Sequence, residues 1–248
     1  MDGGVRPLVR RVTARTVSAW RTPRERRLGI ALVVAAFAAI SFARVTEDYL
    51  TNDPLARWDV SFARWLAGER DGAGTDLARV VTFVGSPAFV LAVCAVVGFL
   101  LYRRGRIADA IFLPLVLGGA ELLNLILKLS FHRQRPEFAF VHLDTYSYPS
   151  GHAMISVAGY GALVYLVWGR LGSWRARALV TGGAAVLVGL ICFSRLYLGV
   201  HYLSDVLAGI AGGFFWLAVA VAIHTLYGDR VAAWLTGSRL DRLLRYGI

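Results

Sequence analysis

The chain has 248 residues, of which 57% are hydrophobic and 17% charged, and its mean hydropathy is +0.57. This balance is typical of an integral membrane protein and argues against a soluble enzyme of the same length. The formal net charge is +11, and all but one of the 27 basic residues are arginine. Cys94 and Cys192 lie in apolar runs without partners at metal-ligand spacing, so we predict packing roles for both and no zinc site.

The first segment, residues 1–27, contains eight arginines and no long apolar stretch. We predict a cytoplasmic, loosely organised arm. The apolar stretch from Leu28 to about Val45 is long enough to cross a bilayer and ends without a small-residue cleavage site, so it predicts an uncleaved first span instead of a signal peptide. An arginine-rich, acid-poor start is also typical of an organellar transit peptide, which stays open as an alternative.

Five further apolar runs follow the first, each ended by charge, glycine or proline. They cover about residues 79–102, 107–129, 153–168, 178–196 and 205–226. Because none alternates with period two, a membrane β-barrel is excluded, and the fold class predicted is an all-α membrane protein with a six-transmembrane-helix bundle over 28–228. Glycine is frequent in the last two runs, which predicts close approach of helix backbones there.

The arginines indicate the orientation of this bundle. With a cytoplasmic amino terminus, 18 of the 27 basic residues fall in segments predicted to lie inside. The positive-inside rule therefore predicts both termini in the cytoplasm. The excess of arginine over lysine, 26 to 1, favours a bacterial plasma membrane as the location. Because the basic residues are spread over four inside segments instead of forming one stripe, nucleic acid is not an expected partner.

Two segments are predicted to be neither spans nor short turns. Residues 47–78 are expected to form an outer loop with a short amphipathic patch around Trp58 and Trp65. Residues 229–248 alternate apolar residues with arginine and are expected to form a cytoplasmic interfacial tail. We interpret both as structural anchors contacting membrane lipids.

Three short polar segments interrupt the apolar runs on the predicted outer side. The first ends the third span, the second precedes the fourth, and the third joins the fifth to the sixth. Their sequences are Lys128-Leu-Ser-Phe-His-Arg-Gln-Arg135-Pro136, Pro149-Ser150-Gly151-His152 and Ser194-Arg195-Leu-Tyr-Leu-Gly-Val-His201-Tyr-Leu-Ser-Asp205. The topology predicts that all three meet at one membrane face.

Three of these residues, Lys128, Arg135 and Arg195, are fixed cations. Gathering them near a bilayer is costly unless an anion with several oxygen atoms lies between them, and the planar fork of arginine suits phosphate. Ser150 and Gly151 precede a predicted helix start, where backbone N–H groups and the helix dipole favour an anion. Phosphate is therefore the predicted guest.

The histidines of these segments suggest the chemistry. His201 and Asp205 are spaced i, i+4, so on a helix the carboxylate can accept the Nδ1 proton and leave Nε2 basic. This is the arrangement of a nucleophile with its orienting group. His152 lies on a different segment and can serve as general acid and then general base. No carboxylate or Cys/His cluster appears on this face, so neither a metal nor another cofactor is expected.

The three segments together resemble the signature of the type 2 phosphatidic acid phosphatase superfamily. All the fixed positions of that signature occur here in order and with the spacing of that family. The first segment has lysine, six residues and Arg-Pro, the second is Pro-Ser-Gly-His, and the third has Ser-Arg, five residues, His, three residues and Asp. The resemblance covers residues 128–205, and the six-span layout is similar to the family's membrane branch rather than to its soluble vanadium haloperoxidases.

This resemblance implies a metal-independent phosphatase with a phosphohistidine intermediate on His201. It implies protonation by His152 and orientation by Asp205. It also implies a phosphate site, which would consist of Lys128, Arg135, Ser150, Gly151, His152 and Arg195. The expected active site faces the outside or periplasm.

The expected substrate is a lipid phosphate or diphosphate, such as undecaprenyl diphosphate, phosphatidylglycerol phosphate or phosphatidate. The alternatives are a lipid phosphotransferase that uses the same intermediate and a non-catalytic protein that binds or transports lipid phosphates. Intact histidines at 152 and 201 argue against the last. The sequence does not indicate the oligomeric state.

Two polar residues of the third span, Glu121 and Asn124, lie on the approach to Lys128. Polar residues within a membrane span are candidates for function, and Glu121 is a candidate for electrostatic support. The three remaining histidines lack such company and are predicted to have surface or packing roles. They are His132, His142 and His224.

Overall fold

The computed structural model describes residues 22–51, 54–141 and 143–237, and every regular element within these ranges is an α-helix. The all-α class is therefore confirmed. The helices are α2 (Pro23–Thr51), α3 (Pro54–Gly68), α4 (Gly72–Val84), α5 (Pro87–Arg103), α6 (Ile107–Phe131), α7 (Gly151–Trp168), α8 (Trp174–Tyr197) and α9 (Leu203–Gly237).

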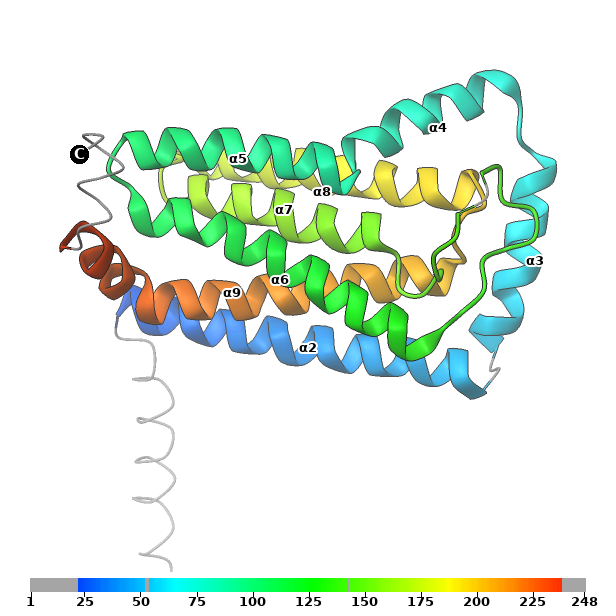
Figure 1. The fold of residues 1–248 in the computed structure, drawn as a ribbon, viewed down its shortest axis with the longest axis horizontal. Helices are drawn as coiled ribbons and strands as arrows, with labels where there is room; N and C mark the ends of the chain where they lie inside the picture. The colour runs from blue at the N-terminus through cyan, green and yellow to red at the C-terminus, as the bar shows by residue number, and fades with distance from the viewer. Residues whose placement is uncertain (1–21, 52–53, 142, 238–248) are drawn as a thin grey trace, which may run out of the picture.

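The long helices run side by side along one axis, as Figure 1 shows, and α3 crosses one end of the bundle. Helix α7 is central, because it packs against α5, α6, α8 and α9, while α2 lies along α9. We call the end with α3 the site end; α6 finishes and α7 and α9 begin there. The opposite end holds the starts of α2 and α6 and the finish of α9.

Five helices are long and apolar enough to cross a membrane by themselves, namely α2, α6, α7, α8 and α9. A sixth span results if α4 and α5, which are bent by 41° relative to each other, count as one. The apolar run predicted as a span at about 79–102 is therefore divided between α4 and α5 and is not one continuous helix. The break occurs where Ser86 Oγ accepts from Phe89 N at 3.3 Å and Pro87 occupies the first turn of α5. A proline is favoured in the first turn of a helix, because its missing N–H would have no partner there.

The outward faces of the spans are apolar. Phe37 on α2 and Leu179 on α8 are 73% and 76% exposed. The interior holds a cluster in which Phe112 and Val116 of α6 pack with Ala158 of α7. A bundle that is apolar outside as well as inside is solvated by lipid.

Several predicted segments differ from the structure at their boundaries. Residues 47–78 are largely helical, because α2 continues to Thr51 and α3 and most of α4 follow. Helix α9 continues through Gly237, into the segment predicted as a tail. The predictions for 1–21, 238–248 and His142 fall outside the described residues.

The glycine prediction is half right. A Cβ atom on Gly209 would lie 2.5 Å from the carbonyl oxygen of Ser150, and one on Gly213 2.7 Å from that of Met154, so α9 and α7 approach closely. On α8, however, Gly182, Gly183 and Gly189 have nothing within 4 Å of such an atom. The α8 glycines therefore lie on an open helix face, where they serve no close contact in the described part of the chain.

Candidate active site

His201 lies in the turn between α8 and α9 and is only 3% exposed. Its Nδ1 atom is 3.4 Å from Asp205 Oδ2, and its Nε2 atom is 3.3 Å from Arg135 Nη1. Since a guanidinium only donates, the contact with Arg135 requires a lone pair on Nε2 and places the ring proton on Nδ1, toward the carboxylate. The tautomer inferred leaves Nε2 as the basic nitrogen.

Asp205 is fully buried in the first turn of α9, and backbone and side-chain donors fix its carboxylate. Oδ2 accepts from the Tyr202 backbone N–H at 2.9 Å, and Oδ1 accepts from Arg133 Nη1 at 2.7 Å. A carboxylate held on both oxygens can orient an imidazole without rotating away from it.

Arg133 extends this network to α3, which the sequence reasoning did not anticipate. Its guanidinium lies between the rings of Tyr49 and Tyr202, 4.5 Å and 4.3 Å from their centroids. Its Nη2 donates to Asp59 Oδ2 at 3.0 Å, and Asp59 Oδ1 also accepts from the Ser204 N–H at 3.0 Å. Arg133 thus joins two buried carboxylates, one on α3 and one beside His201.

A sequence signal for Asp59 did exist. The buried positions of α3 are Ala56, Asp59, Ala63 and Leu66, which recur at helical spacing. A carboxylate within an apolar helix stripe must be paired when it is buried, so Asp59 predicted a cationic partner. The identity of that partner depends on tertiary packing, which local spacing does not show.

The three predicted cations are each held by neutral acceptors. Lys128 Nζ donates to the Tyr146 carbonyl, and Arg195 Nη1 donates to Thr82 Oγ1 at 2.6 Å. Arg135 donates to the Thr145 and Val200 carbonyls, both at 2.7 Å. These bonds orient the groups without neutralising their charge.

The second motif begins α7. The Ser150 N–H donates to the Asp205 carbonyl at 2.9 Å, which joins the start of α7 to that of α9. Asn124 Nδ2 donates to the Pro149 carbonyl at 3.3 Å, and a Cβ on Gly151 would lie 3.0 Å from Asn124 Oδ1. Asn124, singled out only as an intramembrane polar residue, therefore contacts the motif directly. Glu121, one turn away, has a buried Oε1 without a hydrogen-bond partner among the described residues.

His152 follows in the first turn of α7. It lies close enough to Arg195, Arg135, Lys128 and His201 to interact with them electrostatically. All eight residues singled out for catalysis or phosphate binding therefore lie at the site end. His132 also lies at the site end, where it ends α6 in the left-handed conformation, with φ 48°, and its ring centroid is 4.6 Å from that of Tyr146. His224, in contrast, lies at the opposite end.

The electrostatic surroundings favour a neutral His201. Burial lowers the pKa of His201 well below its ordinary value of 6.5, and the three cations act in the same direction. Two buried donors, Ser150 Oγ and Arg195 Nε, have no hydrogen-bond partner in the described ranges. Buried donors are normally satisfied, so this cluster is chemically suited to an anion with several oxygens.

Comparison with known proteins agrees with this chemistry. The model of the PAP2 superfamily matches residues 109–228, a range that includes all three motifs. Phosphatidylglycerophosphatase B of Bacillus subtilis strain 168 is 35% identical over 138 residues, which are 54% of this chain and 66% of that protein. The chain belongs to the PAP2 superfamily.

Two further similarities extend beyond the motifs. A lipid A 1-phosphatase of Rhizobium etli is 28% identical over 183 residues, covering 62% of this chain and 74% of that protein. The crystal structure of a transmembrane PAP2 type phosphatidylglycerolphosphate phosphatase from Bacillus subtilis superposes with a TM-score of 0.66 at 26% identity. That match covers 77% of this chain and 93% of the other. The chain is thus an integral membrane protein of the superfamily's lipid phosphatase branch, with several transmembrane helices.

Proposed function

We propose that this chain hydrolyses the phosphate of a membrane lipid through a covalent phosphohistidine on His201. The observation that carries the proposal is the pair of contacts made by the imidazole of His201. Nδ1 faces the fixed carboxylate of Asp205 and Nε2 faces the guanidinium of Arg135. A basic nitrogen next to a phosphate-binding cation is positioned for attack on phosphorus.

In the first step, Nε2 of His201 forms a bond to phosphorus while the bond from phosphorus to the lipid oxygen breaks. His152 takes up a proton when the negative charge of the bound phosphate offsets the three cations, and it donates that proton to the leaving oxygen. In the second step, neutral His152 takes a proton from water, the water oxygen bonds to phosphorus, and the P–N bond breaks. Inorganic phosphate leaves, and both histidines return to their starting protonation states.

Cationic and backbone donors are proposed to stabilise the charge on the transferring group. Lys128, Arg135 and Arg195 supply fixed positive charge, and Ser150 and Gly151 supply donors at the start of α7. Because these groups perform the role that a divalent cation performs in other phosphatases, the proposed reaction needs no metal.

The proposed substrate class is a lipid phosphate, with phosphatidylglycerol phosphate first and an isoprenyl diphosphate such as undecaprenyl diphosphate second. The order rests on the names of the Bacillus subtilis relatives. We also propose that both termini are cytoplasmic and that the site end faces outward, because the arginines flank the spans in the positive-inside pattern.

The test is phosphate release by the detergent-purified protein in excess chelator. Phosphatidylglycerol phosphate, an isoprenyl diphosphate and a soluble sugar phosphate are compared side by side. Release from a lipid that continues in chelator and disappears in His201→Ala supports the proposal. His132→Asn is the matched control, because asparagine tolerates the left-handed conformation of that position.

Two outcomes would overturn the proposal. Release that stops in chelator contradicts the metal-independent reaction. No release from any substrate, combined with label transfer from the lipid phosphate to an added lipid alcohol, identifies a phosphotransferase. Thermal unfolding of each variant shows whether a loss of activity is a loss of folding.

A further inference from the structure

A cavity of about 650 Å³ lies at the opposite end of the bundle from the active site. It is lined by the starts of α2 and α6 and by the last part of α9. Helix α6 connects the two regions, since Asp109 lies at the cavity and Lys128 at the active site. With a rise of about 1.5 Å per residue, this stretch of helix spans roughly 30 Å, so the cavity is separate from the active site.

Three arginines surround the cavity. They are Arg24 and Arg27 of α2 and Arg106, which precedes α6. Arg24 donates through Nε to the Thr225 carbonyl at 3.1 Å and through Nη2 to the Leu226 carbonyl at 3.0 Å. These neutral acceptors fix the position of the guanidinium but leave its charge uncompensated.

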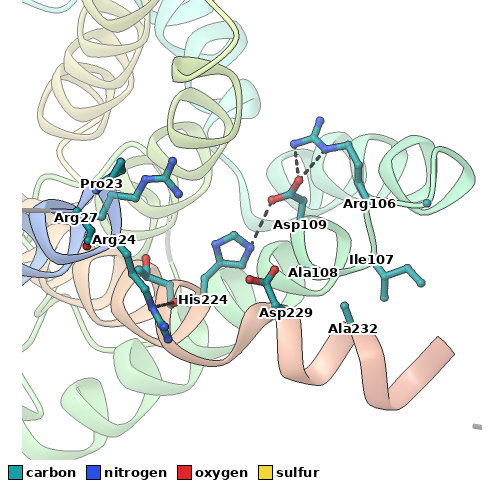
Figure 2. A pocket seen from close by; sticks show the side chains of 13 residues that line it. Pro23, Arg24, Arg27, Arg106, Ile107, Ala108, Asp109, His224, Asp229 and Ala232 are labelled. Atoms are coloured by element: carbon teal, nitrogen blue, oxygen red, sulfur yellow. Dashed lines mark hydrogen bonds and ion pairs between the residues drawn. The ribbon is translucent and has the colours of Figure 1, made fainter. Parts of the chain in front are cut away.

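Two carboxylates also line the cavity. Asp109 accepts from Arg106 Nε at 2.6 Å and lies 3.3 Å from His224 Nε2, as the dashed lines in Figure 2 show. Its charge is therefore already shared within the wall. Asp229 of α9 is exposed at the rim. Arg106 is paired with Asp109, so two cations, Arg24 and Arg27, face one carboxylate, Asp229, that has no ion pair within the described ranges.

The wall that holds Asp109 is rigid. His224 packs against the ring of Phe112, with centroids 4.9 Å apart, and its Nδ1 is 3.2 Å from the Tyr165 hydroxyl. Helix α6 begins at the cavity, and its preceding residue, Arg106, makes no side-chain capping bond. The free N–H groups and the dipole at that helix start add to the positive potential.

We propose that this cavity is a second anion site, which binds the phosphate group of an anionic phospholipid at the membrane face remote from the active site. The guanidinium groups of Arg24 and Arg27 bind the phosphate oxygens, and the pair of Arg106 with Asp109 forms the adjacent wall. The position of the cavity along α2 favours lipid as the source of that phosphate. The apolar part of α2 begins directly after Arg27, so the cavity lies at the level where phospholipid headgroups meet hydrocarbon.

The experiment titrates the detergent-purified full chain with dioctanoyl phosphatidylglycerol and follows its Tm. Dioctanoyl phosphatidylcholine and inorganic phosphate are titrated in parallel. We expect saturable stabilisation by phosphatidylglycerol that neither of the other two reproduces. An equal response to phosphatidylcholine, or to inorganic phosphate, contradicts an anionic lipid site.

Variants locate the binding. Arg27→Gln removes a cation that lines the cavity, whereas Arg26→Gln removes a neighbouring exposed arginine that does not. We expect the first to weaken lipid affinity on the order of tenfold, as the loss of one charge-assisted bond does, and the second to leave it unchanged. Equal losses in both variants mean diffuse surface attraction and overturn the proposal.

An Arg135→Gln variant separates this site from the active site. We expect phosphatidylglycerol to raise the Tm of Arg135→Gln as it does that of the original protein. Loss of this Tm increase would place the lipid at the active site and contradict the proposal. Because the measurement is of binding, it can fail while phosphatase activity is intact, and it can succeed if the proposed phosphatase function is wrong. The Tm of each variant without lipid reports its folding.

Discussion

Arg133 donates to Asp205 at 2.7 Å and to Asp59 at 3.0 Å, so one guanidinium links α3 to the carboxylate that faces His201. Asp59 and Asp205 are both fully buried. Within the described ranges, the Arg133 side chain makes no hydrogen bond to His201 or to the three cations. We therefore assign it a positioning role, which holds Asp205 in place.

Replacing Asp59 tests this positioning role. Asp59→Ala removes one anchor of Arg133 and should reduce kcat on the order of tenfold while leaving KM nearly unchanged, because the phosphate contacts stay in place. Asp59→Asn keeps one accepting oxygen for Arg133 and should recover part of the loss. A rise in KM with kcat unchanged would contradict the role. Breaking the buried pair also lowers the free energy of unfolding, by about 3–5 kcal/mol in comparable pairs.

Asp205→Asn should be far more severe. An amide has only one accepting oxygen, and if Arg133 occupies it, the NH2 group faces His201 Nδ1 and favours the wrong tautomer. We therefore expect kcat to fall on the order of 10³-fold or more, by analogy with orienting carboxylates in hydrolase triads. Steady-state kinetics on the lipid substrate measures this. An Asp205→Asn variant with more than one tenth of the original kcat would exclude Asp205 as the orienting group.

The pH dependence follows from His201. Attack requires neutral imidazole, and burial together with the neighbouring cations lowers the pKa of His201 below its ordinary value of 6.5. The acid limb of kcat/KM should therefore lie below pH 6.5. Arg135→Gln removes one cation, so the protonated form becomes less costly and the limb should move to higher pH in the remaining activity. A shift to lower pH would contradict this electrostatic account.

Asn124 and Gly151 should be coupled. Gly151→Ala places a Cβ 3.0 Å from Asn124 Oδ1 and should displace the phosphate-binding turn, with a loss of kcat/KM of roughly tenfold or more. Asn124→Ala alone loses the bond to the Pro149 carbonyl but makes room for that Cβ. The double variant should therefore be less impaired than the sum of the single effects, which a double-mutant cycle measures. Strict additivity would contradict direct contact.

Two glycines provide a matched test of packing. Gly209→Ala would bring a Cβ to 2.5 Å from the backbone oxygen of Ser150, so α9 must move, and we expect a Tm several degrees lower and reduced activity. Gly182→Ala meets nothing within 4 Å and should stabilise α8 by about 0.5–1 kcal/mol. Equal effects in the two variants would contradict the close approach of α9 to α7.

Local spacing explains why most of the site was predictable. The motifs lie where apolar runs end, so the sequence predicted that they meet at one end of the bundle. The spacing of His201 and Asp205 predicted their contact, although His201 precedes α9 instead of lying on it. The break at Gly85–Pro87 was also marked by proline, but the continuous apolar character of the run masked it. Helical character in residues 47–78 was visible only as a short amphipathic patch.

The other features depend on contacts between distant segments. Asp59 and Arg133 are 74 residues apart in sequence, and no periodicity pairs them. The proposed anion cavity forms only because the starts of α2 and α6 meet the last part of α9. Each helix contributes arginines or carboxylates, which in the sequence alone resemble the charged residues that commonly flank a membrane span. His224, predicted as a packing residue, does pack against aromatic rings, but its contact with Asp109 follows only from the fold.

The most direct test of the central claim is to trap the covalent intermediate. The protein is mixed with lipid substrate carrying ³²P in the transferable phosphate, quenched within milliseconds in denaturant at alkaline pH, and digested for peptide mapping. We predict label that is stable to alkali, released by mild acid, located on His201 and missing from His201→Ala, with His132→Asn labelled normally. Turnover without labelled protein, or label on any other residue, would contradict a phosphohistidine at His201.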